Sequence, residues 1–479
     1  MYERFGLFIG GHWLPDPVGG TAAVFSPVTG QPLGQCPVAA VADTQAAIAA
    51  AEEGLKSWRT KQAFERADAL HKIADEMLRR TDEAARMIST ETGKPIAQAG
   101  REWGLSIDQF RWYAEEARRI YGRIVESRVP GGRFEVTHEP IGVVAAFTAW
   151  NFPAALVARK VAPALAAGCS VIVRPSSQTP GVAMVMMDCC RAGNLPDGVV
   201  NLVVGPTEAT YAPLMASKAV RKVSLTGSTR VGQQMIRDAA DTLKKVSMEL
   251  GGNAPLIVYD DADLELALNI SVPTKFANAG QVCVTADRFF IHERLHDAFV
   301  EGFVKRAAAI RLGDGLKPDV GMGPLINARR LSEIEGIVND AVTSGATLTH
   351  GGKRSPEFNA GHFFEPTVLI NVTDDMTVFA EENFGPIAAI TRFADEDEVL
   401  ARANASDMGL SAYAFTNSPA RARRTIASLK AGMVGINSFA MAASEAPFGG
   451  TNFSGMGREG GIEGIRDYLD VKLSQTVWS

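Results

Sequence analysis

The stretch IGVVAAFTAWNFPAALVARKVAPALAAGCSVIVR, residues 141–174, decides the fold class. It begins with a short apolar strand over Ile141–Phe147, continues through a helix over Pro153–Ala167 that ends at Gly168, and returns to a strand over Ser170–Val173. A strand with a continuous apolar run is buried on both faces, as in parallel sheets covered by helices. The segment therefore predicts a parallel α/β sheet.

The same alternation extends along the chain and predicts a second sheet. A second series begins at Leu256–Tyr259 and runs towards residue 440. We therefore expect an α/β fold with two doubly wound parallel-sheet domains. The remaining elements of the first sheet are expected at Gly181–Ala192 (helix), Val199–Val204 and Lys222–Leu225 (strands), and near Gln233–Ala240 (helix).

Segments outside this alternation predict a small β element. Arg123–Glu139 alternates around PGG (130–132) as an antiparallel hairpin, and Asp470–Trp478 alternates weakly as an edge strand, which needs a partner. Phe8–Trp13 predicts a short hairpin, and Phe64–Ile88 predicts one helix that stops at GKP (93–95).

Composition narrows the functional classes. The chain has 479 residues, which favours two or three domains, and 46% hydrophobic with 21% charged residues is typical of a soluble globular protein. A net charge of -6 without a long basic run disfavours nucleic acid as the main partner. The longest apolar run, Ala154–Val173, contains Arg159 and Lys160, so we expect no membrane span, and the first residues resemble no secretory signal.

The cysteines favour a reducing cytoplasm over a disulfide framework, because they are few, odd in number and scattered. The seven histidines form no zinc-like cluster with them, so no metal site is expected. The cysteines are Cys36, Cys169, Cys189, Cys190 and Cys283.

Three polar residues are candidates for catalysis. Cys283 ends the segment NAGQVC (278–283), where Gly280 permits a close turn beneath a nucleophilic thiol. Glu249 ends a strand-like run before two glycines and could act as a general base, and Asn151 follows an apolar strand and could stabilise an oxyanion. The alternatives are a buried inert cysteine, a solvated glutamate before a turn, and an asparagine that caps the next helix.

Two further segments lie where a nucleotide could bind. TGSTRVG (226–232) lies between a strand and a helix, and the N-terminus of such a helix can bind a phosphate. RPSS (174–177) follows the carboxyl end of a strand, where residues of such a sheet bind a nucleotide ribose. The alternatives are an ordinary strand-to-helix turn and a solvated loop.

Together and in this order, the motifs resemble the aldehyde dehydrogenase superfamily over nearly the whole chain. The specific pair is ELGG (249–252) with GQVC (280–283). The other matching stretches are WNFP (150–153), TGST (226–229), EENFGP (381–386) and PFGG (447–450).

The resemblance implies a role for each catalytic candidate. Cys283 attacks an aldehyde, the Asn151 amide and the Cys283 amide hold the oxyanion, and Glu249 activates the water that hydrolyses the thioester. Lys160 and Glu459 match a proton-relay pair, for which the alternative is a structural ion pair. Cofactor contacts are implied at Trp150, Arg174, Ser176, Ser177, Gly205, Gly227, Ser228, Gly232, Leu250, Glu382 and Phe384.

The cofactor is expected to be NADP or NAD, with NADP at least accepted. Members that prefer NAD often carry a glutamate at the position of Ser177, and a carboxylate there would repel a 2′-phosphate. Arg174 adds a cation in place of the usual lysine.

Within the superfamily the chain is most similar to succinate-semialdehyde dehydrogenases. Arg159 matches an arginine that binds the substrate's distal carboxylate, although it could instead pair with a neighbouring acid. Two departures stand out: Ala277 replaces a usual second arginine, and Thr285 replaces a cysteine that allows a redox switch in some members. A longer aliphatic or an aromatic aldehyde therefore stays open as substrate.

The same residues disfavour two other functions. A CoA-acylating dehydrogenase needs no base at Glu249, and a catalytically silent binding protein needs neither Cys283 nor Asn151. The resemblance further implies a cofactor-binding domain (1–117 and 141–250), a catalytic domain (251–447), and a bridging element (118–140 and 448–479) that builds a homodimer or homotetramer.

Overall fold

The strand–helix–strand unit lies at the centre of the larger of two sheets in the computed structural model, which describes residues 2–478. It consists of β7 (Val143–Phe147), α5 (Ala155–Ala167) and β8 (Ser170–Arg174). Every residue of β7 and α5 is buried, which explains the continuous apolar pattern. As expected, Gly168 ends α5 in the left-handed region, at φ 90°.

The first sheet has eight strands in the order β2-β1-β9-β8-β7-β10-β11-β21. The strands from β9 to β11 are parallel, and the edge strands β1, β2 and β21 run antiparallel. The chain moves outward from β7 to β9 and then returns to place β10 on the other side of β7, which creates a topological switch point. The other strands are β1 (Leu7–Ile9), β2 (His12–Leu14), β9 (Val200–Leu202), β10 (Val220–Thr226), β11 (Lys245–Glu249) and β21 (Gly455–Met456).

Helices cover this sheet. The prediction of one helix over Phe64–Ile88 is wrong, because the segment forms two helices, α2 and α3. The chain leaves helical geometry at Arg80 (φ -103°, ψ 20°), where the guanidinium Nη1 lies 2.7 Å from Asp188 Oδ2 of a neighbouring helix. The periodicity continues across this break, so the pattern alone concealed it. The helices of this body are α1 (Val41–Trp58), α2 (Ala63–Arg79), α3 (Thr81–Thr92), α4 (Ile96–Ala117), α6 (Gly181–Cys190), α7 (Thr207–Ala216), α8 (Thr229–Ala240) and α15 (Gly461–Arg466).

The second sheet has seven strands in the order β14-β15-β16-β13-β12-β18-β19, parallel except for β14. Its apolar core is separate from that of the first sheet, so the predicted fold class is confirmed. The strands are β12 (Ala254–Val258), β13 (Ala286–His292), β14 (Thr347–His350), β15 (Thr367–Ile370), β16 (Ile387–Phe393), β18 (Ser411–Phe415) and β19 (Met433–Ile436). The helices are α9 (Leu264–Phe276), α10 (Glu293–Ala308), α11 (Ala328–Thr343), α12 (Thr377–Ala380), α13 (Glu396–Ala403) and α14 (Pro419–Ser428).

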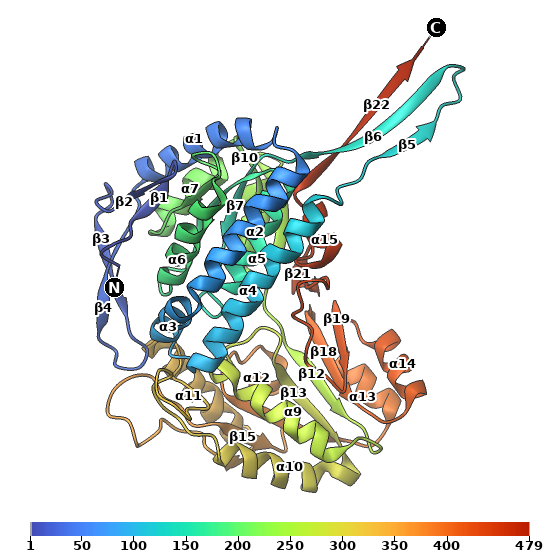
Figure 1. Cartoon of the computed structure of the whole chain (residues 1–479). Helices are drawn as coiled ribbons and strands as arrows, with labels where there is room; N and C mark the ends of the chain where they lie inside the picture. Colours follow the sequence, from blue (N-terminus) through green and yellow to red (C-terminus); the bar gives the residue numbers. More distant parts are fainter. Residues whose placement is uncertain (1, 479) are drawn as a thin grey trace.

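A three-stranded arm projects from the first body (Figure 1). It consists of β5 (Arg123–Glu126), β6 (Gly132–Pro140) and β22 (Leu469–Val477), and β22 pairs with β6 from Leu469↔Pro140 to Val477↔Gly132. Both the predicted hairpin and the predicted edge strand are therefore confirmed. Two small two-stranded pairs, β3 (Thr21–Phe25) with β4 (Pro32–Pro37) and β17 (Met408–Gly409) with β20 (Thr451–Asn452), complete the fold.

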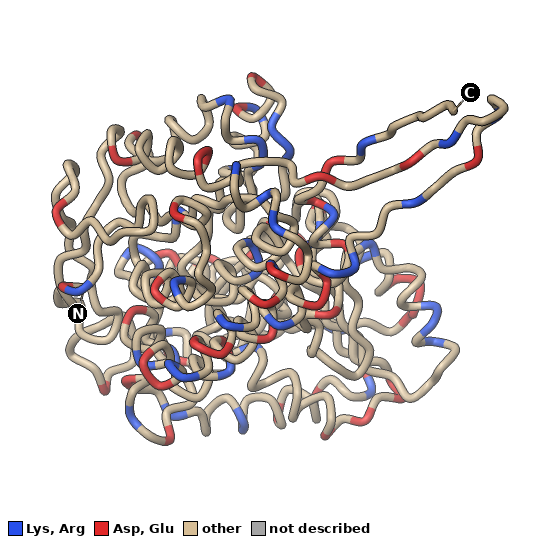
Figure 2. Tube along the Cα trace, turned by 45° about the horizontal axis from the view of Figure 1, so that its top comes forward, with Lys and Arg blue, Asp and Glu red and all other residues tan. Residues whose placement is uncertain are grey.

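Acidic and basic residues are interspersed along both bodies and the arm (Figure 2). Of the helices that the structure describes, none combines the length and apolar character that crossing a bilayer requires.

Candidate active site

The candidate residues meet where the carboxyl ends of the first sheet face the amino ends of two strands of the second. Asn151 follows β7 and Glu249 ends β11, while Cys283 precedes β13 and Glu382 precedes β16. The switch point between β7 and β10 opens on the same side, where open α/β sheets bind ligands. Residues of both bodies therefore build one site.

A strained turn presents Cys283. Asn278 and Ala279 both have positive φ, 48° and 55°, followed by Gly280 at 70°. At Gly280 a Cβ atom would lie 2.0 Å from the Gly385 carbonyl oxygen, so only glycine fits. The sequence predicted the turn at Gly280 but not the strain before it, which holds the segment in a conformation that few non-glycine residues adopt. Cys283 is partly exposed, whereas the other four cysteines are buried.

The Cys283 thiol is neutral in the free protein at neutral pH. Burial, followed by the charges of Glu382 and Glu249, raises its pKa to about 12, and Arg159 opposes this rise. A thiolate is the nucleophilic form of cysteine, so attack needs a base or a cation nearby.

Asn151 is fixed from three directions. Its Nδ2 donates to the Gln281 carbonyl at 3.1 Å, and its own carbonyl accepts from Lys94 Nζ at 2.7 Å and from Asn278 Nδ2 at 3.1 Å. The second hydrogen on Nδ2 can therefore donate to an oxyanion near Cys283. Asn151 does not cap the next helix, because the N-cap of α5 is Ala154.

A buried ion pair that sequence reasoning missed supports Asn151 and α5. Lys94 Nζ lies 2.6 Å from Glu102 Oε2, and both side chains are buried. Glu102 Oε1 accepts a hydrogen bond from the Ala154 amide at 2.8 Å, so this free amide at the start of α5 has a partner. The pair thus links the oxyanion candidate to the helix that carries Arg159 and Lys160.

Glu249 is buried, which excludes a solvated glutamate before a turn. It is 4% exposed, and its Oε2 has no hydrogen-bond partner in the described part of the chain. Gly449 leaves space for it, since a Cβ there would lie 2.7 Å from Glu249 Oε1. Burial and the neighbouring charge of Glu459 raise the pKa of Glu249 well above its ordinary value, although Lys160 opposes them.

Lys160 and Glu459 form a buried ion pair beside Glu249. Lys160 Nζ donates to Glu459 Oε1 and, at 2.9 Å, to Thr226 Oγ1 at the end of β10. The contact is consistent both with a structural pair and with a proton relay, so the relay stays a prediction.

Arg159 forms no salt bridge with a carboxylate among residues 2–478. Its Nη2 donates to the Ala442 carbonyl at 3.1 Å, and its guanidinium carbon lies 4.4 Å from the centre of the Phe448 ring. Its Nη1 is buried without a hydrogen-bond partner. The alternative of an arginine tied to a neighbouring acid is therefore wrong. Ala277, where a second arginine was expected, is only partly exposed.

The implied cofactor residues on the second body form a compact set. Glu382 Oε1 accepts from the Gly252 amide at 2.9 Å, and burial raises the pKa of Glu382 to about 8. Phe384 and Trp150 make an edge-to-face pair with ring centres 5.5 Å apart. Sequence reasoning missed Arg330, whose Nε donates to the Phe384 carbonyl at 3.3 Å.

On the first body, the cofactor candidates follow the ends of β8, β9 and β10. Arg174 Nη2 donates to the Gly205 carbonyl at 3.0 Å, and the Ser176 hydroxyl accepts from the Gln178 amide. Ser177 is exposed. Ser228 caps α8 by accepting from the Val231 amide, and Leu250 packs against Gly232, where a Cβ would lie 2.5 Å from its Cδ2. Gly227 donates its amide to the Glu249 carbonyl at 2.9 Å.

Within the described residues, no group of three or more His, Cys, Asp or Glu side chains is arranged to hold a metal ion.

Comparisons with known proteins point to one family. Residues 13–474 match the aldehyde dehydrogenase family. The 3-sulfolactaldehyde dehydrogenase of Pseudomonas putida is 44% identical over 97% of this chain and 95% of its own length. The NADP(+) succinate-semialdehyde dehydrogenase of Escherichia coli K12 is 42% identical over 97% of this chain and 96% of its own. The crystal structure of succinate-semialdehyde dehydrogenase from Burkholderia pseudomallei superposes with a TM-score of 0.97, at 42% identity over 99% and 98% of the two chains.

Proposed function

The chain belongs to the aldehyde dehydrogenase family, and we propose that it oxidises an aldehyde with a second, acidic group, such as succinate semialdehyde, through a thioester on Cys283. The buried, unpaired Nη1 of Arg159 carries the proposal, because an unpaired buried cation suits an acidic ligand. The names of two relatives support it, since one acts on a sulfonated and one on a carboxylated aldehyde.

In the first half of the reaction, the Cys283 sulfur attacks the aldehyde carbon. The Asn151 amide and the Cys283 backbone amide donate hydrogen bonds to the oxygen as it becomes negative. A nicotinamide dinucleotide held beside Glu382 would supply the hydride acceptor that this oxidation needs, and the thioester would stay on Cys283. The set fits a dinucleotide: Glu382 Oε1 is bound to Gly252, its Oε2 is available to a ribose hydroxyl, and Gly251 leaves space where a Cβ would lie 2.8 Å from that oxygen.

In the second half, Glu249 takes a proton from the water that hydrolyses the thioester. Its carboxyl must first lose its own proton, because its pKa is raised. The Lys160–Glu459 pair lies beside it and gives that proton a route away from the site.

We propose that NADP is accepted, with Arg174 and the exposed Ser177 near the adenosine ribose. The measurement is kcat/KM for both cofactors. A preference for NAD above about a hundredfold, nearly 3 kcal/mol, contradicts the proposal.

A second candidate is a longer aliphatic or an aromatic aldehyde, favoured by Ala277 in place of a second arginine. Losing one of two charge-assisted contacts, each about 1.5–3 kcal/mol, weakens selection for a short dicarboxylic semialdehyde. Against a CoA-acylating enzyme stands the buried Glu249, and turnover without CoA tests that alternative.

The decisive experiment compares succinate semialdehyde with uncharged aldehydes of equal length. We expect the native protein to have a lower KM for succinate semialdehyde than for the uncharged aldehydes. In Arg159→Gln we expect the KM values for the acidic and uncharged aldehydes to become similar. Equal kcat/KM for acidic and uncharged aldehydes in the native protein rejects the proposed substrate class, while turnover of the panel as a whole tests the chemistry.

We further propose the domain division stated above and a homodimer or homotetramer. The exposed strands of the arm support an assembly, since an unpaired edge favours a partner.

A further inference from the structure

Arg159 is a buried cation whose charge the described residues 2–478 leave without a salt bridge. It is 6% exposed, its Nη1 has no hydrogen-bond partner, and its Nη2 meets only a carbonyl. The buried Lys94, Lys160 and Lys275 each pair with a carboxylate. The buried Lys222 and Arg288 have no carboxylate either, but their nitrogens bond to hydroxyl or carbonyl oxygens, whereas Arg159 keeps a nitrogen with no partner among the described residues. Burying an uncompensated charge is costly, so a negative group is expected to complete the surroundings of Arg159.

Arg159 and Cys283 share one small apolar cluster. Leu410, Met433 and Phe448 form that cluster, and Cys283 packs against it. The Arg159 guanidinium lies over the Phe448 ring and bonds to Ala442, which packs against the same cluster. Arg159 is buried against the same cluster that Cys283 contacts, so its charge is less screened by solvent than a surface charge.

The other ionisable groups that face the sulfur disfavour its ionisation or stay neutral. Glu249 of β11 and the loop residue Glu382 raise the pKa of the thiol, and Arg159 of α5 is the cation that lowers it. Tyr413 of β18 donates its hydroxyl to the Val284 carbonyl, and burial raises its pKa, so it stays neutral. Lys160, Arg458 and Glu459 act on Glu249, and so does Arg159.

We propose that Arg159 is the counter-ion of the Cys283 thiolate fraction that grows as pH rises above neutrality, and that an acidic group bound at Arg159 competes for this charge. The step is an ionisation: the S–H bond breaks, the proton passes to water, and nothing is oxidised. The inference rests on the proposed function in one respect, because the competing acid is the distal group of the proposed substrate.

The test uses the full-length protein without cofactor or aldehyde. The rate of Cys283 alkylation by iodoacetamide, a neutral reagent, is followed by mass spectrometry between pH 7.5 and 9.5. Below the thiol pKa this rate is proportional to the thiolate fraction. We expect Arg159→Gln to react about tenfold more slowly, as for a pKa shift of one unit, and Arg159→Lys to react within about threefold of the native protein because it keeps the charge.

Arg294→Gln is the matched control, since Arg294 is 74% exposed and is expected to leave the rate unchanged. An Arg159→Gln rate within twofold of the native one overturns the proposal. A folded Arg159→Lys that reacts as slowly as Arg159→Gln does so too, because the charge would then not be the cause.

A second reagent separates this inference from the proposed function. Iodoacetate carries the carboxylate that Arg159 is proposed to recognise, so the ratio of iodoacetate to iodoacetamide rates, referenced to free cysteine, reports acid binding. A high iodoacetate-to-iodoacetamide ratio, with no slower alkylation in Arg159→Gln, retains acid recognition by Arg159 and rejects its role as counter-ion. A low ratio, with clearly slower alkylation in Arg159→Gln, retains the role as counter-ion and rejects acid recognition.

If Arg159→Gln does not fold, the proposal can still be tested with the native protein by adding small competing ligands. Propionate and propionamide have the same size but different charge. We expect propionate to slow alkylation by iodoacetamide more than propionamide does, and equal responses to the two contradict the proposal.

Discussion

Glu249 is the residue whose protonation is expected to control hydrolysis of the thioester. Replacing Glu249 by glutamine keeps its size and removes the base. We expect Glu249→Gln to accumulate acylated Cys283 after aldehyde and cofactor are added, with turnover lower by about 10²–10⁴-fold. Mass spectrometry of Cys283 measures the adduct, and substitution of an exposed glutamate, Glu381→Gln, is the control.

The pH dependence of the same step follows from the raised pKa of Glu249. The protonated carboxyl predominates at and above the ordinary range for a glutamate, so hydrolysis should increase as pH rises and the carboxylate forms. Returning the protein to lower pH should reprotonate Glu249 and slow the hydrolysis. A native rate of deacylation that is independent of pH across this rise contradicts the assignment.

At this scale, the residues that the sequence predicted are those inside local motifs. The three catalytic candidates each lie in a short segment whose local pattern, a turn or the end of a strand, indicated a catalytic role. They are Cys283, Glu249 and Asn151. Lys94 was missed because it lies 57 residues from the carbonyl it binds, and a lysine between glycine and proline is typical of a helix stop. The strain at Asn278 was missed because contacts distant in sequence hold this residue, with its amide bonded to Gln98 at 3.0 Å and its side chain to the Asn151 carbonyl at 3.1 Å.

Among the elements, α3 and α6 meet through a buried carboxyl. Glu91 Oε1 accepts from the Tyr2 hydroxyl at 2.7 Å and from the Gly181 amide at 2.8 Å, and Oε2 has no partner among residues 2–478. Burial raises the pKa of Glu91 to about 7 from 4.5. A folded pKa above the unfolded one gives stability that is present below pH 4.5 and is lost as pH rises to about 7.

We therefore expect Glu91→Gln, which keeps the accepting oxygen without the charge, to flatten this dependence. The variant should exceed the native protein in free energy of unfolding at pH 8, by at most about 3 kcal/mol, and the difference should shrink near pH 5. Urea unfolding at the two pH values measures this, with the exposed Glu52→Gln as control. A constant difference between the two pH values would count against the prediction.

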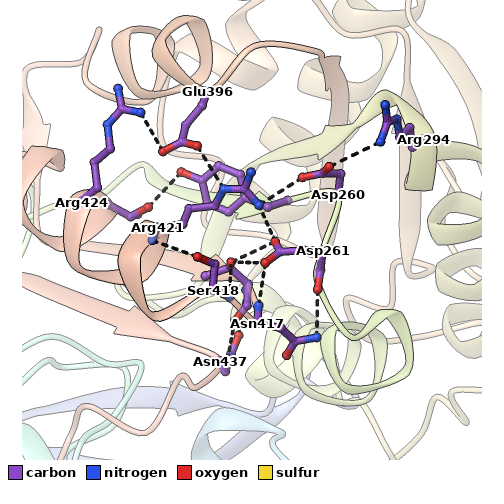
Figure 3. A network of polar contacts seen from close by, with 12 residues as sticks. Asp260, Asp261, Arg294, Glu396, Asn417, Ser418, Arg421, Arg424 and Asn437 are labelled. Atoms are coloured by element: carbon purple, nitrogen blue, oxygen red, sulfur yellow. Dashed lines mark hydrogen bonds and ion pairs between the residues drawn. The ribbon is translucent and has the colours of Figure 1, made fainter.

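The loop after β12 is tied to α13 and α14 by a polar network around Arg421 (Figure 3). Arg421 Nη1 lies 2.6 Å from Asp261 and 3.1 Å from Asp260, and Nε lies 3.0 Å from Glu396. Because one guanidinium joins three carboxylates, the network resists the screening that weakens isolated surface pairs.

We expect Arg421→Ala to lower the free energy of unfolding of this body by about 2 kcal/mol. Arg294→Ala, at 3.6 Å from Asp260 and 74% exposed, should cost less than about 0.5 kcal/mol. Thermal unfolding of both variants tests the contrast, and equal losses would show that the network adds nothing beyond its separate pairs.

Elements were predictable where one face or a whole strand is apolar. The sheet strands and the arm were predicted because burial on two faces or strict alternation leaves a clear pattern. Helix α4 was missed because it buries polar residues, Glu102 and Gln109, beside Trp103 and Phe110. A helix with buried polar groups lacks the single apolar stripe that periodicity detects.

For the whole molecule, the arm predicts an assembly that depends on one face of β22. Val471 and Leu473 lie on the same face and are 69% and 63% exposed. We expect the double variant Val471→Glu with Leu473→Glu to have a lower molar mass by light scattering, whereas Thr476→Glu, on the other face, should not. A native protein that is monomeric at micromolar concentration would contradict the proposed assembly.

The pairing of Lys160 with Glu459 joins positions 299 residues apart. During synthesis, Lys160 therefore leaves the ribosome long before the only carboxylate bonded to it in the described structure has been made. A nascent or prematurely terminated chain would bury this lysine without its partner, at a cost of several kcal/mol. Quality-control proteases would thus meet an unfinished chain in an unstable form, and the reactive sulfur would acquire its surroundings only as translation ends.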